Sequence, residues 1–274
     1  MSSYQLHCNR HKGDHAKAPL LLVHGICHNS QCWDTNYVPF FSVRGHDVYT
    51  LNLRGHGTDR RQLDQFGLDD YVDDVIAALG QLDGKAILVG HSMGGALVQK
   101  AMSQASAKIA AVVLLASMVP GSMTALEKLL LLRKPKSVLA LRRLLAGTSL
   151  SPKQINRLPF FMGRLSEQHT QGAVRWLQPE SKKALRELGS FATQGGTQPF
   201  PLLVLGSRQD YLFGASSLRR TAAHYRTQAV VLEQGCHDLM LDPDWLSSAT
   251  YIANWLDEHL PCIPPQRYQI ISSE

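Results

Sequence analysis

The sequence is poor in the features that mark several large classes of protein. It has only five cysteines in 274 residues, and no two form a Cys-x-x-Cys pair. This argues against a disulfide scaffold or a zinc ribbon and favours a reducing compartment. No apolar run approaches the roughly 18–20 residues that span a bilayer. The N-terminus lacks the charged head and apolar stretch of a secretory signal. We therefore expect a cytoplasmic protein with no transmembrane segment.

Motifs for nucleotides, nucleic acids and metals are also missing. There is no Gly-x-Gly-x-x-Gly segment and no P-loop, so we expect no nucleotide cofactor. There is no helix-turn-helix, zinc-finger or RNA-binding signature, so we expect no nucleic-acid partner. His7, His11 and His15 are spaced by four, as metal ligands on a helix would be, but Gly13 lies among them. We predict no cofactor and no metal site.

The positive charge is concentrated in the middle of the chain. The net charge is +6, and residues 118–199 hold 13 basic against 4 acidic side chains, whereas the remainder holds 15 against 18. Two interpretations are open. The excess can be the solvated surface of helices, or it can attract an anionic substrate, a carrier or a membrane surface that this segment touches peripherally.

Hydrophobic residues make up 44% of the chain, which is enough for a large core and excludes global disorder. Apolar runs without polar alternation recur at wide spacing, as in parallel strands buried on both faces. Helical patterns lie between them. The alternation predicts an α/β fold with a mostly parallel sheet. The predicted strands are 20–23, 48–53, 86–89, 112–116, 202–205 and 230–232, and the predicted helices are 68–82, 93–105, 216–225 and 244–260.

No convincing strand appears between about residues 118 and 198. Ser137 is a candidate N-cap for a helix that Gly147 closes, Ser151 and Pro152 form a second helix start, and 180–188 is a third helix. We predict that residues 1–117 and 199–274 form the core and that residues 118–198 form a helical cap over the carboxyl edge of the sheet.

The most informative segment is Gly-x-Ser-x-Gly at residues 90–94, which follows a buried strand and precedes a helix. In this nucleophile elbow the serine occupies a very sharp turn, so its neighbours two positions away must lack bulk. The hydroxyl then projects at the top of the sheet, beside the N-terminal N–H groups of the helix. We predict that Ser92 is a nucleophile.

A serine nucleophile needs a base, and the base needs an orienting acid. Most acids after Ser92 fall in the predicted cap, and Glu233 lies too near the best histidine. Asp210 follows the strand at 202–205 by a short loop, and His237 follows the strand at 230–232 in the same way. Both are therefore expected at the carboxyl edge, where Ser92 also lies. His224 and His259 fall in predicted helices, and Cys236 is too close to His237 in sequence to face it.

A buried strand at 20–23 runs into His24 and Gly25. The glycine allows the backbone to approach the reacting centre closely. The N–H groups of Ile26 and Met93 can then stabilise a tetrahedral oxyanion, with His24 holding the loop.

These segments together resemble the α/β-hydrolase superfamily, in its branch with a helical cap. The matching pieces are His-Gly at 24–25, Leu-Arg-Gly-His-Gly at 53–57, Gly-His-Ser-Met-Gly-Gly at 90–95, the loop 206–210 and Gly-Cys-His-Asp at 235–238. Residues 24–33 also resemble plant methylesterases and hydroxynitrile lyases, from which the chain departs in residues 54–57 and in the cap. The resemblance implies an α/β-hydrolase fold, an N-terminal β-hairpin, the triad Ser92, Asp210 and His237, and oxyanion donors at Ile26 and Met93.

We therefore predict a serine hydrolase that cleaves a carboxylic ester or thioester of a small molecule through an acyl-enzyme. Apolar cap residues suggest an apolar acyl group, and the cap charge suggests an anionic substrate. A cofactor-free oxygenase or lyase on the same triad stays open, as does a non-catalytic binding module. The predicted pocket residues are Cys27, His28, Leu129, Phe160, Phe161 and Trp176.

Overall fold

The computed structural model describes residues 7–13, 17–57, 60, 62–121 and 133–260. Its centre is a seven-stranded sheet with the strand order β1-β3-β2-β4-β5-β6-β7. All neighbouring strands are parallel except β1 and β3. The strands are β1 (His7–His11), β2 (Leu20–Val23), β3 (Val48–Asn52), β4 (Ala86–His91), β5 (Ile109–Leu115), β6 (Leu202–Ser207) and β7 (Ala229–Leu232).

The inner strands owe their place to unbroken apolar runs. Every residue of β2 and β4 is buried, because helices cover both faces of the sheet. The prediction of an α/β-hydrolase fold with a mostly parallel sheet is confirmed. The expected N-terminal hairpin falls partly outside the described residues; within them, β1 pairs antiparallel with β3 at the edge of the sheet, His7 opposite Asn52. A pairing between strands so far apart in sequence leaves no turn signal to detect.

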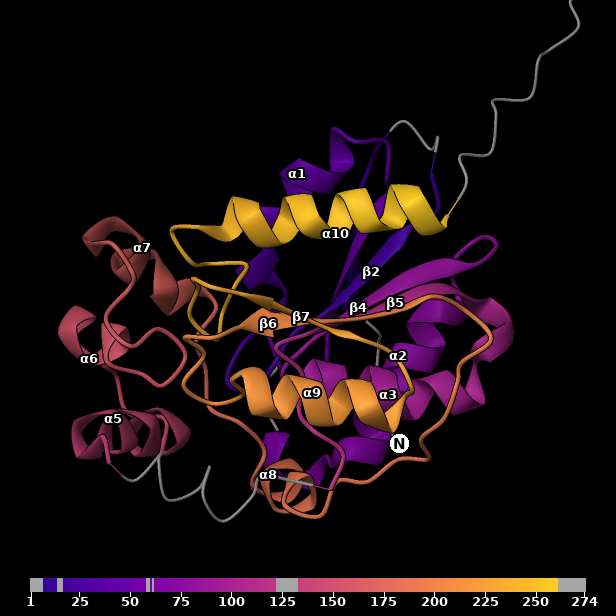
Figure 1. The fold of residues 1–274 in the computed structure, drawn as a ribbon. Coiled ribbons are helices and arrows are strands. Elements are labelled where there is room, and N and C mark those ends of the chain that lie inside the picture. Colours follow the sequence, from indigo (N-terminus) through magenta and orange to yellow (C-terminus); the bar gives the residue numbers. More distant parts are fainter. Residues whose placement is uncertain (1–6, 14–16, 58–59, 61, 122–132, 261–274) are drawn as a thin grey trace, which may run out of the picture.

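Helices form a layer on each face of the sheet (Figure 1). One face carries α1 (Tyr37–Ser42) and α10 (Trp245–His259), and the other carries α2 (Leu68–Gly80), α3 (Met93–Gln104) and α9 (Ala215–His224). Helix α2 buries Tyr71, Val72 and Val75 on one side, while Asp69 and Asp70 in its first turn favour the helix dipole. None of the helices in the described residues is both long and apolar enough to cross a bilayer.

Between β5 and β6 the described chain contains α5 (Pro135–Leu145), α6 (Pro152–Asn156), α7 (Glu167–Gly172) and α8 (Lys182–Leu188). Helices α5 to α7 lie beyond the carboxyl edge of the sheet, whereas α8 packs against α2 of the core (Figure 1). Ser151 caps α6 as predicted. Helix α5, however, begins at Pro135 rather than after Ser137, because proline suits the first position of a helix. The boundaries 118 and 198 stay a prediction.

Candidate active site

Ser92 lies at the sharp turn between β4 and α3. Its backbone has φ 53° and ψ −116°, in a region that residues with a Cβ rarely adopt. Such strain persists only where the surroundings enforce it, and it is typical of functional sites. The side chain does not cap α3 and makes no hydrogen bond to any residue that the structure describes. The hydroxyl is therefore not committed to a structural role.

The glycines two positions from Ser92 are required by close backbone approaches. A Cβ on Gly90 would lie 2.6 Å from the carbonyl oxygen of Gly94, and a Cβ on Gly94 would collide with the carbonyl oxygen of Val23. Backbone atoms cannot move aside as flexible side chains can. The steric reason for Gly-x-Ser-x-Gly inferred from the sequence is thus the one that the geometry shows.

Asp210 and His237 meet at the same edge, after the neighbouring strands β6 and β7. His237 Nδ1 donates to Asp210 Oδ2 at 2.9 Å, and both side chains are buried. Asp210 Oδ1 accepts from the backbone N–H groups of Leu212 at 2.7 Å and Phe213 at 3.0 Å. The other ring nitrogen of His237, Nε2, is buried without a partner in the described part of the chain. It is the nitrogen that a general base would use.

The electrostatics distinguish His237 from the neighbouring thiol. Burial opposes a charge on His237, but the carboxylate of Asp210 and its hydrogen bond outweigh it, so the pKa of His237 lies above its ordinary 6.5. Burial raises the pKa of Cys236 well above its usual value. A thiol that stays protonated is a poor nucleophile, so the chemistry of Cys236 does not favour it as a nucleophile.

The loop after β2 passes directly beside Ser92. A Cβ on Gly25 would lie 2.9 Å from Cβ of Ser92. The next residue, Ile26, donates no backbone hydrogen bond within the described residues, and neither does Met93 on the other side of Ser92. Two unused N–H groups therefore lie on the two segments that border Ser92. Their assignment as oxyanion donors stays a prediction.

The predicted pocket residues gather around this edge, apart from Leu129, which lies outside the described residues. The Phe160 ring centroid is 6.2 Å from that of His237, and Phe161 packs at 5.8 Å from Trp176. Trp176 stacks on His28 at 5.2 Å. Cys27 and His28 are almost fully buried, so the contact of either with a substrate stays a prediction.

Two buried acids near this edge were not predicted. Asp238 accepts from His28 Nε2 at 2.8 Å, and burial would raise its pKa, but the histidines around it hold that pKa below its usual value. Glu180 contacts His56 Nε2 at 3.1 Å and accepts from the N–H of Cys27 at 3.2 Å. The only signal in the sequence was that Asp238 follows His237 directly; nothing marked Glu180.

One group of side chains has the spacing of a metal site. His91, His237 and Asp238 each offer a ligand atom, and these atoms lie within 4.8 Å of one another. Hydrogen bonds to protein groups account for these orientations: His237 is held by Asp210, Asp238 by His28, and His91 Nε2 donates to the carbonyl of His237 at 3.1 Å. Burial lowers the pKa of His91 to about 3, so this ring is neutral.

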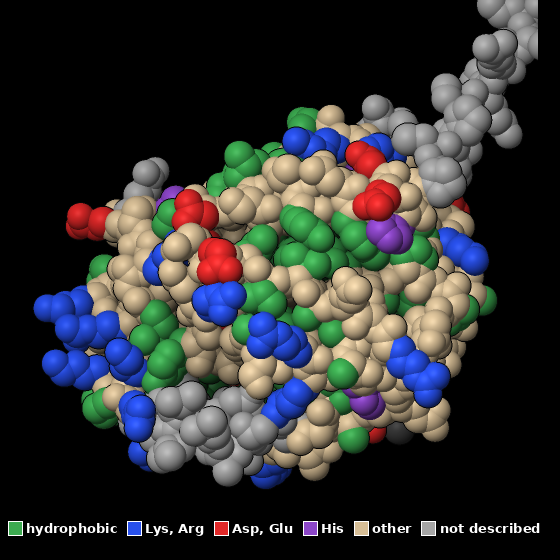
Figure 2. Space-filling view, viewed as in Figure 1, with side chains coloured by type: hydrophobic (Ala, Val, Ile, Leu, Met, Phe, Trp, Pro, Cys, Tyr) green, Lys and Arg blue, Asp and Glu red, His purple; other side chains and the backbone are tan. Residues whose placement is uncertain are grey.

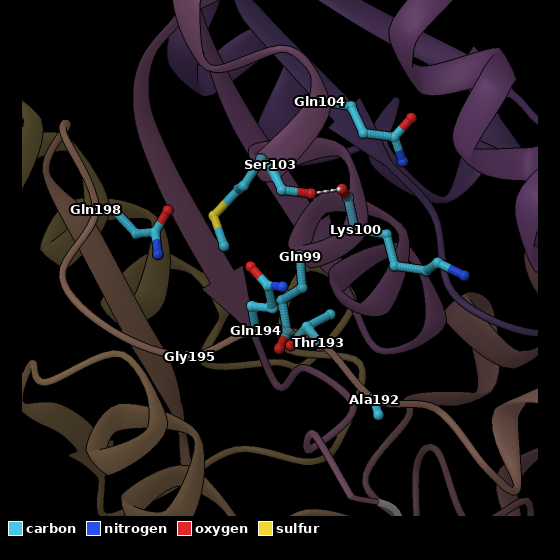
Figure 3. A pocket seen from close by; sticks show the side chains of 10 residues that line it. Gln99, Lys100, Ser103, Gln104, Ala192, Thr193, Gln194, Gly195 and Gln198 are labelled. Atoms are coloured by element: carbon cyan, nitrogen blue, oxygen red, sulfur yellow. Dashed lines mark hydrogen bonds between the residues drawn. The ribbon is translucent and has the colours of Figure 1, made fainter.

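A separate polar hollow of about 270 Å³ lies at the far end of α3 (Figure 3). It is lined by the second half of α3 and by residues 192–195 and 198. Ser103 in this hollow donates to the carbonyl of Lys100 at 2.9 Å. Because Ser92 precedes the first residue of α3, this hollow is not part of the candidate active site.

Sequence comparison shows similarity to one large group of proteins. A model described as "Alpha/beta hydrolase family" matches residues 20–249. Salicylic acid-binding protein 2 of Nicotiana tabacum is 39% identical over 105 residues, which cover 37% of this chain and 40% of that protein. Methylesterase 7 of Arabidopsis thaliana is 36% identical over 104 residues, covering 36% and 40%. The chain thus spans about two fifths of the length of these curated relatives.

Solved structures agree over a longer stretch. A meta-cleavage product hydrolase from Pseudomonas fluorescens is similar with a TM-score of 0.71 at 18% identity, covering 92% of this chain and 95% of that one. A methylesterase from Arabidopsis gives a TM-score of 0.67 at 21% identity, covering 88% and 100%. At these identities the agreement concerns the fold.

Proposed function

Because the chain belongs to the alpha/beta hydrolase family, we propose that it is a serine hydrolase that cleaves a carboxylic ester or thioester with an apolar acyl group. The observation that carries the proposal is the buried Asp210–His237 hydrogen bond of 2.9 Å at the edge where Ser92 occupies a strained elbow. A binding protein has no need of an oriented histidine whose outer nitrogen is unused.

In the proposed mechanism, His237 Nε2 takes the proton of Ser92 as the hydroxyl oxygen attacks the acyl carbonyl. Asp210 holds Nδ1 protonated, which keeps Nε2 free to act as the base, and stabilises the imidazolium that forms. That imidazolium then protonates the leaving alcohol or thiol. In the second half of the reaction, His237 takes a proton from water as the water oxygen attacks the acyl carbonyl. The bond from that carbon to Ser92 Oγ then breaks, the acid leaves, and His237 returns the proton to Ser92 Oγ.

The N–H groups of Ile26 and Met93 complete the proposal. Negative charge develops on the carbonyl oxygen in each tetrahedral intermediate, and two fixed donors beside Ser92 stabilise it. The loss of one such donor typically costs about 3–4 kcal/mol of barrier. The N-terminus of α3, which begins at Met93, adds its dipole with the favourable sign.

The names of the relatives support an ester substrate, since several are esterases of plant origin. The apolar acyl group is supported by Phe160, Phe161 and Trp176, a cluster of ring contacts that reaches His237 through Phe160. We expect the protein to hydrolyse p-nitrophenyl esters, with kcat/KM rising as the acyl chain is lengthened from acetate. No hydrolysis of any ester or thioester in such a panel would contradict the proposal.

The raised pKa of His237 sets the expected pH dependence. Only the neutral ring can act as a base, so activity is lost below its pKa. Since Asp210 holds that pKa above 6.5, kcat/KM for a neutral ester should rise with pH along a limb whose midpoint lies above 6.5. Initial rates at constant ionic strength measure it. A midpoint below 6.5 would show that another group controls the reaction.

The cap charge supports an anionic substrate. Lysine and arginine side chains gather over α5 and α6 (Figure 2). A hollow of about 350 Å³ at the start of α5 is lined by Arg133, Lys134, Lys136 and Arg157. Arg142 and Arg143, farther along α5, are exposed. An acyl chain on an anionic head group would use both the apolar and the basic features of this cap.

For such a substrate we expect kcat/KM to fall with added salt more than for a neutral ester of equal chain length, because the Debye length is only about 10 Å at 0.1 M. Arg142→Glu with Arg143→Glu should weaken only the anionic substrate. The matched control is Lys85→Glu with Arg219→Glu, two exposed residues outside the cap. If salt and the cap variant affect both esters equally, the substrate is not selected by charge.

A further inference from the structure

His28 has a hydrogen-bond acceptor at each ring nitrogen. Nδ1 lies 2.6 Å from the carbonyl oxygen of Ile26, and Nε2 lies 2.8 Å from Asp238 Oδ2. A carbonyl and an ionised carboxylate can only accept. Asp238 is ionised, because its pKa is held below the usual value. Each ring nitrogen of His28 therefore faces an acceptor, Nδ1 on the loop that carries Ile26 and Nε2 on the loop that carries His237.

The surroundings of His28 hold its ring in place. The ring is 1% exposed and stacks on Trp176 with an interplanar angle of 6° at 5.2 Å, while Phe160 meets it edge-on at 5.3 Å. The partner of His28, Asp238, is fully buried as well, and a buried polar group is costly unless it is hydrogen-bonded. His28 and Asp238 thus form a buried hydrogen-bonded pair that the mechanism above does not use.

This pair acts on the loop that carries the proposed oxyanion donor. The peptide between Ile26 and Cys27 is held at both ends: its carbonyl accepts from His28, and its N–H donates to Glu180 Oε2 at 3.2 Å. The carbonyl of Cys27 accepts from the N–H of Gln178 at 2.8 Å. Cys27 has φ 61°, a conformation that a residue with a Cβ adopts only when its surroundings enforce it.

Glu180 is itself anchored on the core. Its carboxylate contacts His56 Nε2 at 3.1 Å and accepts from the hydroxyl of Tyr71 at 3.3 Å. Two contacts therefore clamp the Ile26–Cys27 peptide. Its carbonyl is held through His28 by the loop that carries His237, and its N–H is held by Glu180, on the segment that leads into α8. Neither contact is made through Ser92 or His237.

We propose that His28 is a positioning residue which, anchored by Asp238 and opposed by Glu180, clamps the Ile26–Cys27 peptide and so holds the N–H of Ile26 at the oxyanion position. The inference rests on the proposed function, since it concerns the oxyanion of that reaction. Because Asp238 follows His237 directly, the clamp also keeps the oxyanion donor in a constant position relative to the base.

The test compares His28→Gln and Asp238→Asn with wild type. For each, kcat and KM are measured with an ester, and the Ki of a trifluoromethyl ketone is measured with the same acyl group, because this inhibitor forms an oxyanion on the serine. A displaced donor weakens transition-state binding and spares substrate binding. We expect kcat to fall on the order of 10²-fold, Ki to weaken by a similar factor, and KM to change little. Glu180→Gln should show the same pattern.

The matched control is His46→Gln. His46 is also buried and contacts a backbone carbonyl, that of Ala18, through Nδ1 at 2.7 Å, but this carbonyl precedes β2, whereas the oxyanion loop follows that strand. A merely structural loss would lower the melting temperature of His46→Gln and His28→Gln alike without a selective change in Ki. If His28→Gln does not fold, the same measurements on Asp238→Asn decide.

Two failures are distinguishable. If kcat falls while Ki for the ketone stays at the wild-type value, or if Ki stays unchanged in all the clamp variants, the clamp is overturned and the proposed hydrolase stands. If wild type neither turns over esters nor is inhibited by the ketone, the proposed function itself fails.

Discussion

Replacing Ser92 by alanine is expected to lower ester turnover by about 10³-fold or more while the protein stays folded. The hydroxyl makes no hydrogen bond to the described residues, so its removal leaves no buried partner unsatisfied. Alanine carries the same Cβ as serine and meets the same strain at φ 53°. The loss therefore falls on chemistry rather than on stability. It is measured as kcat for a p-nitrophenyl ester, with the fold checked by circular dichroism.

The matched control is Ser103→Ala at the far end of the same helix. Ser103 is exposed, and its hydroxyl donates to the carbonyl of Lys100, so turnover should stay near wild type. A Ser92→Ala protein that retained its turnover would show that no covalent intermediate forms on this residue.

Asp210→Asn is expected to lower kcat by about 10³–10⁴-fold. In the wild type, the N–H groups of Leu212 and Phe213 donate to Asp210 Oδ1. Asn keeps an oxygen that can accept these two hydrogen bonds, so the loop should hold its shape. Its amide N–H₂ then faces His237 Nδ1 and favours the tautomer with the proton on Nε2. That nitrogen can no longer accept a proton from Ser92.

The comparison for this variant is Asp257→Asn, which removes a charge from a half-exposed acid paired with Lys17. Its turnover should be unchanged. Rates are measured across pH, since a base with the wrong tautomer loses activity at every pH, whereas a shifted pKa only moves the limb. Asp210→Asn activity that recovers fully at high pH would contradict an orienting role.

Much of the sheet could be predicted from the sequence because parallel strands buried on both faces leave unbroken apolar runs. Each of the runs chosen at 20–23, 86–89 and 202–205 overlaps a strand. The first strand could not be found in this way, since β1 lies at the edge with an exposed and intermediate pattern. The pairing of β1 with β3 is set by tertiary packing.

The candidate site likewise contains residues that local sequence pattern predicts and residues that only tertiary contacts bring together. Ser92, Asp210 and His237 each follow a recognisable strand, and parallel strands bring their ends to one edge, so order along the chain was enough to group them. His28 contacts Asp238, and Cys27 contacts Glu180, across long stretches of sequence. The first contact depends on how the loop after β7 meets the loop after β2, and the second on how the cap segment crosses that loop. Local pattern contains no such information.

A covalent intermediate on Ser92 can be detected by chemical labelling. The protein is incubated with a fluorophosphonate probe, digested, and the modified residue is located by mass spectrometry, with Ser92→Ala treated in parallel. We expect a single adduct on Ser92, loss of ester turnover in proportion to labelling, and no adduct in Ser92→Ala. An adduct on Cys236, or full turnover in a protein labelled completely at Ser92, would contradict the account.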